Sequence, residues 1–151
     1  MHRQLAIVAT LAGLCFGPSA SAQFQKPEDA VKYRQSGMVV MANHFGRIGA
    51  MVNGRAPYDA AAATANAEIV ATLPRLPFAG FVDGTASTEK GKASGKIWSD
   101  RGKFDGGARK MQEETAKLLA AARTQNLDNI KAAFGEAGKT CKGCHDEYRN
   151  Q

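Results

Sequence analysis

Two cysteines and a histidine stand close together near the end of the 151-residue sequence, in Cys141-Lys142-Gly143-Cys144-His145. The spacing Cys-x-x-Cys-His is the attachment signature for haem c. On a helical turn the two thiols point to the same side and can add to the two vinyl groups of a porphyrin, while the adjacent imidazole can bind the iron. The motif therefore predicts one covalently attached haem c, held by Cys141 and Cys144, with His145 as the metal ligand.

Three other uses of a Cys-x-x-Cys pair fit this sequence less well. A thioredoxin-like redox pair needs a βαβ context and a cysteine at the start of a helix, and neither pattern is visible. A zinc site needs four ligands, but after residue 22 the sequence offers only one further histidine, His44, and no further cysteine. A plain disulfide would leave His145 without a role.

Residues 1–22 have the three parts of a secretory signal peptide. Arg3 stands near the start, an apolar run covers residues 5–17, and small residues at 20–22 precede the expected cleavage point. The apolar run is shorter than the roughly 20 residues that span a bilayer, so we expect export to the periplasm without a stable membrane anchor. Cys15 leaves with the signal. In an oxidising compartment the other two cysteines should be a disulfide, metal ligands or covalently modified.

The composition suits one domain over residues 23–151. The chain is 44% hydrophobic and 23% charged, which is enough apolar material to bury a core. Its formal net charge is +6, but the densest basic residues, between 90 and 103, alternate with Gly, Ser and Ala and have few aromatic neighbours. We interpret them as a solvated loop that does not bind nucleic acid. They could attract an acidic redox partner, whose identity is unknown.

Four segments carry apolar residues at helical spacing, and no segment shows a long β-type alternation. They begin at Pro27, near Asp59, at Ser99 or Asp100, and near Leu127. Between residues 80 and 95 the sequence is rich in Gly, Ser, Thr and Lys, which predicts a flexible connection.

Both cysteines continue the buried stripe of the last predicted helix. That stripe has two rows of residues seven apart, namely Leu127, Phe134, Cys141 and Tyr148, and Ile130, Ala137 and Cys144. Four helices with short links between the first two and the last two predict an all-α fold, an antiparallel up-down four-helix bundle with covalently bound haem c. Part of its interior should then be haem rather than side chains.

The position of the haem motif separates the haem folds. Only six residues follow His145, so nearly all of the haem pocket must come from upstream sequence. A signal peptide, four helices and a C-terminal haem motif together resemble cytochrome c′, the class II c-type cytochrome family. Further stretches that are similar to family members occur at 26–36, 43–47, 56–60, 97–100 and 132–135.

The resemblance implies roles for four further cofactor-binding residues. It implies that His145 binds the iron on one side and that an apolar side chain of the first helix, Met38, blocks the other side. It implies that Arg34 lies near a haem propionate, that Phe81 lines the pocket, and that Arg149 lies beside His145. The family often forms homodimers through its first two helices, so we expect a homodimer here as well.

The resulting functional expectation is a periplasmic haem protein with five-coordinate iron. Such a protein carries electrons, binds nitric oxide and carbon monoxide, or does both. The alternative is a six-coordinate, low-spin electron carrier in which Met38 is the distal ligand. An enzyme such as a peroxidase is not expected, because no distal histidine is available as a general acid or base.

Overall fold

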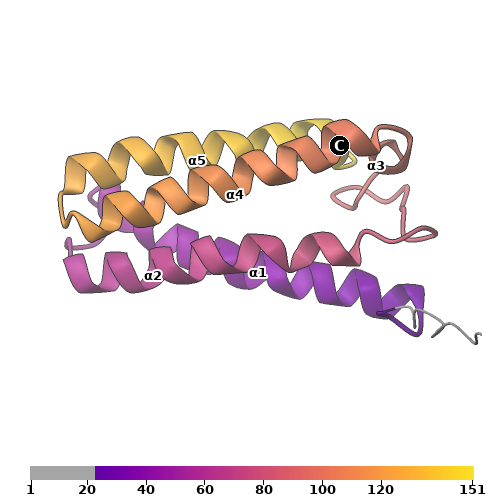
Figure 1. The fold of residues 1–151 in the computed structure, drawn as a ribbon, viewed down its shortest axis with the longest axis horizontal. Coiled ribbons are helices and arrows are strands. Elements are labelled where there is room, and N and C mark those ends of the chain that lie inside the picture. The colour runs from indigo at the N-terminus through magenta and orange to yellow at the C-terminus, as the bar shows by residue number, and fades with distance from the viewer. Residues whose placement is uncertain (1–22) are drawn as a thin grey trace, which may run out of the picture.

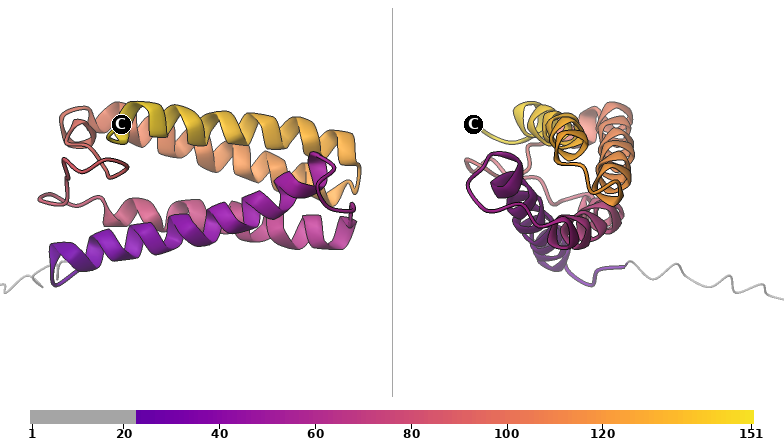
Figure 2. Two further views of the ribbon diagram at one scale, coloured as in Figure 1. Left: turned by 180° about the vertical axis from the view of Figure 1, so that it is seen from behind. Right: turned by 90° about the vertical axis from the view of Figure 1, so that its left-hand side faces the viewer.

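The computed structural model describes residues 23–151, and the predicted signal peptide at 1–22 lies outside this part of the chain. The four long helices are α1 (Pro27–Val52), α2 (Ala60–Thr72), α4 (Arg101–Arg123) and α5 (Leu127–Tyr148). They alternate in direction along the bundle (Figures 1 and 2). The predicted antiparallel four-helix bundle is therefore confirmed.

Shorter elements fill the connection between α2 and α4. Two 3₁₀ turns, η1 (Leu73–Arg75) and η2 (Pro77–Gly80), follow α2, and α3 (Lys96–Ser99) precedes α4. Pro74 and Pro77 follow the end of α2, where a proline cannot continue a regular helix, whereas the apolar pattern of the sequence did not predict α3. A helix of four residues is too short to show a periodic apolar pattern.

Side-chain caps set the starts of α2 and α5. The carboxylate of Asp59 accepts a hydrogen bond from the backbone N–H of Ala62 (2.9 Å), and Asn126 caps the first N–H groups of α5 in the same way. Asp100 occupies the cap position of α4, as predicted, but makes no capping bond. Its carboxylate accepts a hydrogen bond from the hydroxyl of Tyr148 (3.1 Å). Asp100 thus connects the start of α4 to the end of α5.

The core is divided into two clusters along the bundle. The larger cluster contains buried residues of all four long helices, Ile48, Met51, Val52, Ala63, Ala67, Val70, Leu118, Ala122, Ile130 and Ala137. The rings of Phe45 and Phe134 stack on each other with their centroids 4.2 Å apart, and both pack against this cluster. The smaller cluster contains only Ile97, Phe104 and Tyr148 as buried members. It lies at the end of the bundle where α5 ends and α4 begins (Figure 1).

The connection at 80–95 is fixed to the end of α5, which corrects the prediction of a flexible segment. Ala93 and Arg149 form an isolated antiparallel bridge, and the N–H of Ser94 donates to the carbonyl of Tyr148 (2.9 Å). Gly84 and Gly91 have φ values of +75°, which a glycine adopts without strain. The polar composition therefore reflects turns and backbone hydrogen bonds rather than mobility.

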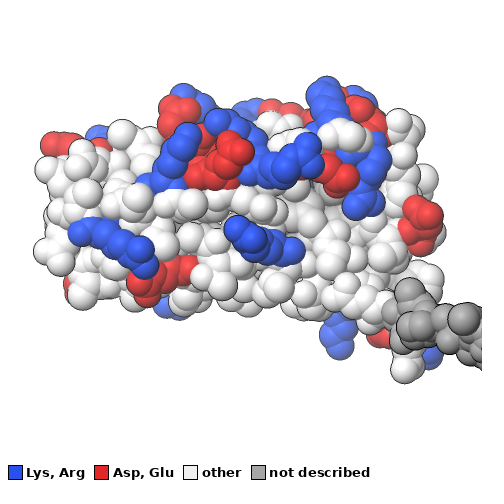
Figure 3. Space-filling model, in the orientation of Figure 1, with Lys and Arg blue, Asp and Glu red and all other residues white. Residues whose placement is uncertain are grey.

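The surface differs between the two pairs of helices. Figure 3 shows charged side chains of both signs over the half of the molecule that contains α4 and α5, and a mostly uncharged surface over α2. The charged half includes ion pairs along α4, such as Arg101–Asp105 and Lys110–Glu114. Within residues 23–151, no helix is both long enough and apolar enough to cross a membrane.

Candidate haem-binding site

The two cysteines of the motif lie on the last turns of α5, close to one turn apart and therefore on the same side of the helix. Both residues are half-buried and neither forms a disulfide. Burial raises the pKa of both thiols above the ordinary value. Cys144 packs against the cluster of Ile97, Phe104 and Tyr148. The structure therefore places at least Cys144 against the smaller core cluster.

His145 is exposed and follows Cys144 directly on α5. Desolvation lowers the pKa of its imidazole below the ordinary value, and the positive charge of Arg149 lowers it further. A lowered pKa keeps the ring neutral at pH 7, and the neutral ring is the form that binds metals. His145 lies at the edge of a hollow of about 270 Å³, which we call the His145 hollow. Its other lining residues are Lys90, Gly91, Asp146, Arg149, Asn150 and Gln151.

Arg34 is a buried cation on α1, with only 5% of its surface exposed. Its guanidinium donates hydrogen bonds to the carbonyl of Gly80 (3.0 Å) and to the hydroxyl and carbonyl of Thr85 (2.6 and 2.7 Å). These acceptors are all neutral, and burial lowers the pKa of the guanidinium. Among the described residues no carboxylate pairs with it. A buried cation with neutral partners can accommodate an anion such as a haem propionate.

Phe81 connects Arg34 to the end of α5. The guanidinium of Arg34 lies 4.5 Å from the centroid of the Phe81 ring, and this ring lies 4.9 Å from that of Phe104. The ring of Phe104 in turn meets that of Tyr148 edge to face at 5.3 Å. Arg34, Phe81 and Cys144 therefore border one aromatic cluster, although they are far apart in the sequence.

Met38 lies one turn after Arg34 on α1 and is half-buried. A second hollow, of about 500 Å³, adjoins Arg34 and is lined by Val31, Gln35 and Thr85 among others. Met38 is not among the residues that line it. The predicted role of Met38 at the iron therefore stays a prediction.

Several residues of this region were missed by the sequence analysis. Thr85 is 4% exposed and bonds Arg34 twice, yet it stands in a polar segment that gives no signal of burial. The indole N–H of Trp98 and the hydroxyl of Ser94 are buried, and within residues 23–151 neither has a hydrogen-bond partner. Trp98 packs against the same small cluster as Cys144, and Ser94 is hydrogen-bonded to Tyr148 of that cluster. Orphaned buried donors are expected where a further polar group belongs. With the thiols, the neutral imidazole and Arg34, they fit a haem.

An all-α bundle whose last helix carries half-buried Cys141 and Cys144 and an adjacent histidine is the architecture of a bundle-type c-type haem protein. The family model described as Cytochrome C′ matches residues 29–149. The chain belongs to the cytochrome c′ family, and membership implies a covalently bound haem c.

Similar proteins agree in sequence and in structure. Cytochrome c′ of Alcaligenes xylosoxydans xylosoxydans is 51% identical over 129 residues, covering 85% of this chain and 99% of the relative. The crystal structure of cytochrome c′ from Rubrivivax gelatinosus is 46% identical, with a TM-score of 0.79, and covers 85% of this chain and 100% of that one. A nitric oxide complex of a cytochrome c prime variant from Alcaligenes xylosoxidans is 50% identical, with a TM-score of 0.78, and covers 85% and 99%.

Proposed function

We propose that this chain is a periplasmic haem protein with five-coordinate iron that transfers electrons, binds nitric oxide and carbon monoxide, or does both. It is not proposed to be an enzyme. The haem supplies a one-electron redox centre and an iron that can take a diatomic ligand. The protein residues hold the haem, orient it and limit the access of water.

Each site residue has a proposed task. Cys141 and Cys144 form the two thioether bonds, and His145 binds the iron through its neutral imidazole. Arg34 holds a propionate, and Phe81 fixes the guanidinium by lying against it at 4.5 Å. Arg149 keeps a positive charge beside His145, which disfavours the protonated imidazole.

The observation that carries the proposal is the arrangement around Arg34. Its buried guanidinium has only neutral partners and borders, through Phe81, the aromatic cluster against which Cys144 packs. The charge and the attachment residue Cys144 thus border one part of the bundle, as a haem with two propionates requires. The gas-binding part of the proposal is supported by the relative at 50% identity that is described as a nitric oxide complex.

A second candidate is the six-coordinate electron carrier with Met38 as distal ligand. Its support is the position of Met38 on α1, one turn beyond Arg34. A thioether ligand would raise the reduction potential and close the gas site.

Absorption spectra of the ferric and ferrous holoprotein, with and without carbon monoxide and nitric oxide, distinguish these two candidates. High-spin spectra that change on adding either gas support five-coordinate iron. A low-spin ferric spectrum with the charge-transfer band of a methionine ligand, lost in Met38→Leu, would support the second candidate instead. His145→Ala should lose normal ligation while the haem stays covalently attached, which denaturing electrophoresis with haem staining checks.

Export and partners complete the proposal. The signal sequence at 1–22 supports a periplasmic location, which cell fractionation of the full-length product tests.

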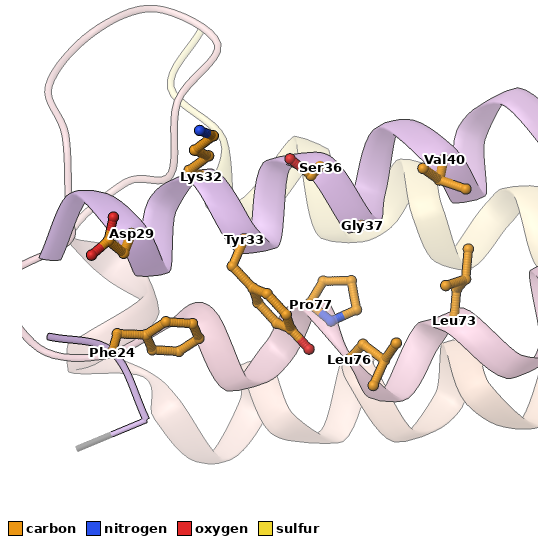
Figure 4. Close-up of a pocket in the computed structure, with 10 residues that line it drawn as sticks. All are labelled: Phe24, Asp29, Lys32, Tyr33, Ser36, Gly37, Val40, Leu73, Leu76 and Pro77. Atoms are coloured by element: carbon orange, nitrogen blue, oxygen red, sulfur yellow. The ribbon is translucent and has the colours of Figure 1, made fainter. Parts of the chain in front are cut away.

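We also propose a homodimer through α1 and α2 and an unidentified redox partner, without nucleic-acid binding or a stable membrane anchor. An apolar groove of about 490 Å³ supports the dimer. Figure 4 shows Tyr33, Leu76 and Pro77 lying between α1 and the chain that follows α2.

A further inference from the structure

The loop at residues 85–94 contacts both parts of the candidate site. Near its start, Thr85 accepts two hydrogen bonds from the buried guanidinium of Arg34. Further along, the carbonyl of Gly91 accepts a hydrogen bond from Nε of Arg149 (2.7 Å). The loop therefore runs from the proposed propionate side to the His145 side of the site, and its position affects the surroundings of both.

Asn150 makes four hydrogen bonds to this loop. Its side-chain amide donates to the carbonyls of Ser87 (2.7 Å) and Glu89 (2.9 Å). Its backbone N–H donates to the carbonyl of Lys92 (2.9 Å), and its own carbonyl accepts from the N–H of Gly91 (2.8 Å). Asparagine suits this position because its amide carries two N–H donors on one short side chain.

The loop and the end of α5 meet at the His145 hollow. Lys90 and Gly91 of the loop line this hollow together with Asn150, His145 and Arg149. Gly91 has a φ of +75°, and a Cβ built on it would lie 3.2 Å from Nη2 of Arg149. Gly91 therefore lets the guanidinium lie directly against the loop backbone. If the loop moved away, Arg149 would lose its hydrogen-bond acceptor at Gly91, and its guanidinium would no longer be held in the lining of the His145 hollow.

We propose that Asn150 is a positioning residue for the His145 side of the haem: by holding the 85–94 loop against the end of α5, it fixes the guanidinium of Arg149 in the lining of the His145 hollow. This inference rests on the proposed function, because the consequence concerns a bound haem. It adds a residue outside the haem motif to the control of that face.

The test compares the Asn150→Ala and Asn53→Ala variants of the holoprotein. Asn53 is the matched control, because its side-chain amide also donates to a backbone carbonyl, that of Gly49 (2.7 Å), where α1 ends at the opposite end of the bundle. Asn150→Ala should raise hydrogen exchange at the Gly91 amide by about tenfold, since the loop loses two side-chain hydrogen bonds.

Two further measurements connect the loop to the haem. The rate constant for nitric oxide binding to the holoprotein should rise at least about threefold in Asn150→Ala, since Arg149 would no longer be fixed in the lining of the His145 hollow. The midpoint potential should fall, because solvent exposure stabilises the ferric form. Carbon monoxide binding should not change. Asn150→Gln keeps the amide and should therefore show smaller changes than Asn150→Ala in each of these measurements. Asn53→Ala should show none of the changes.

Unchanged exchange at Gly91 in Asn150→Ala would overturn the inference. So would a rise in exchange with no change in either the rate constant for nitric oxide binding or the midpoint potential, because Asn150 would then have a purely structural role. If wild-type protein gives no response to nitric oxide, the gas-binding part of the proposed function fails. Exchange and midpoint potential still decide the role of Asn150 in that case.

Discussion

Arg34 is the residue with the most demanding environment in the site. Its fork of N–H groups reaches the Gly80 carbonyl and both oxygens of Thr85 from one buried position. A lysine ammonium is a compact charge on a flexible stem and cannot reproduce this planar geometry. Arg34 therefore has a structural role in fixing the chain after α2 as well as its proposed role toward a propionate.

We predict that Arg34→Ala lowers the free energy of unfolding of the holoprotein by about 2–3 kcal/mol, because the acceptors at Gly80 and Thr85 lose their buried donor. Arg34→Lys should recover less than half of this loss. Guanidinium unfolding followed by helix circular dichroism measures both. Arg47→Ala, at an exposed position on the same helix, is the control. Equal stabilities for Arg34→Ala and Arg47→Ala would contradict the prediction.

The residues of the site differ in how far the sequence reveals them. Cys141, Cys144 and His145 could be predicted because their chemistry requires a fixed local spacing. Thr85 and Asn150 could not, because each acts through hydrogen bonds to residues distant in sequence. A threonine or asparagine in a polar segment has the same local pattern whether or not such contacts form.

At the scale of elements, Gly49 on α1 lies directly against Phe134 on α5. A Cβ built on Gly49 would lie 2.9 Å from Cζ of Phe134, whereas a Cβ on Gly46 would meet no atom within 4 Å. Gly49 thus allows the stacked rings of Phe45 and Phe134 to lie between the helices. At Gly46, on the same helix, no neighbouring atom requires a residue without a side chain.

Gly49→Ala should destabilise the holoprotein by about 1–3 kcal/mol through overpacking. Gly46→Ala should instead stabilise it by about 0.5–1 kcal/mol, because alanine has the higher helix propensity. Thermal unfolding of the two variants beside the wild type tests this opposite behaviour. The packing explanation fails if both substitutions move the stability in the same direction.

Glu114 on α4 provides a pH-dependent contribution. Hydrogen bonds from Lys110 and Lys117 hold the pKa of its carboxyl below the ordinary value of about 4.5. The ionised form therefore stabilises the folded state at neutral pH, and this contribution is lost as the pH falls below about 4.5 through the folded-state pKa. Glu114→Gln should be less stable than wild type at pH 7. The difference in the free energy of unfolding between the two proteins should narrow only as the pH falls below about 4.5. Urea unfolding at a series of pH values measures it; a gap that stays constant down to pH values well below the folded-state pKa would contradict this.

The elements were predictable where packing repeats along a helix. The rows Phe104, Met111 and Leu118, and Ala108, Thr115 and Ala122, are buried as their spacing of seven predicts. The loop at 85–94 was not predictable, because its order comes from the backbone of residues 148–150, and backbone hydrogen bonds leave no mark on residue type.

At the scale of the whole molecule, the large exposed apolar side chains and most of the ion pairs of the described residues lie on different elements. Val39, Val40 and Leu76 are 60%, 45% and 47% exposed and belong to α1 and the segment after α2, whereas ion pairs cover α4. A cluster of exposed apolar side chains beside a groove is more typical of an interface than of free surface. This separation supports the proposed homodimer through the first two helices.

The double variant Val40→Asp/Leu76→Asp should shift the protein from dimer to monomer, because two new charges per subunit would be buried at the interface. Ala120→Asp, at an exposed position on α4, is the control and should leave the dimer intact. Sedimentation velocity over a range of micromolar concentrations measures the change. A wild-type protein that is monomeric throughout this range would contradict the proposed dimer.

The two unequal core clusters also have a consequence for unfolding. The larger cluster joins all four long helices through their own side chains, whereas the smaller one has three buried members and borders the proposed haem. We therefore expect the two ends of the bundle to depend on different sources of stability: the larger cluster on the polypeptide, and the smaller cluster on the bound haem as well. After loss of haem, we expect the bundle to keep much of its helix content but no longer to unfold in a single two-state transition. The end of the bundle that contains Phe45 and Phe134 should then be the last part to unfold.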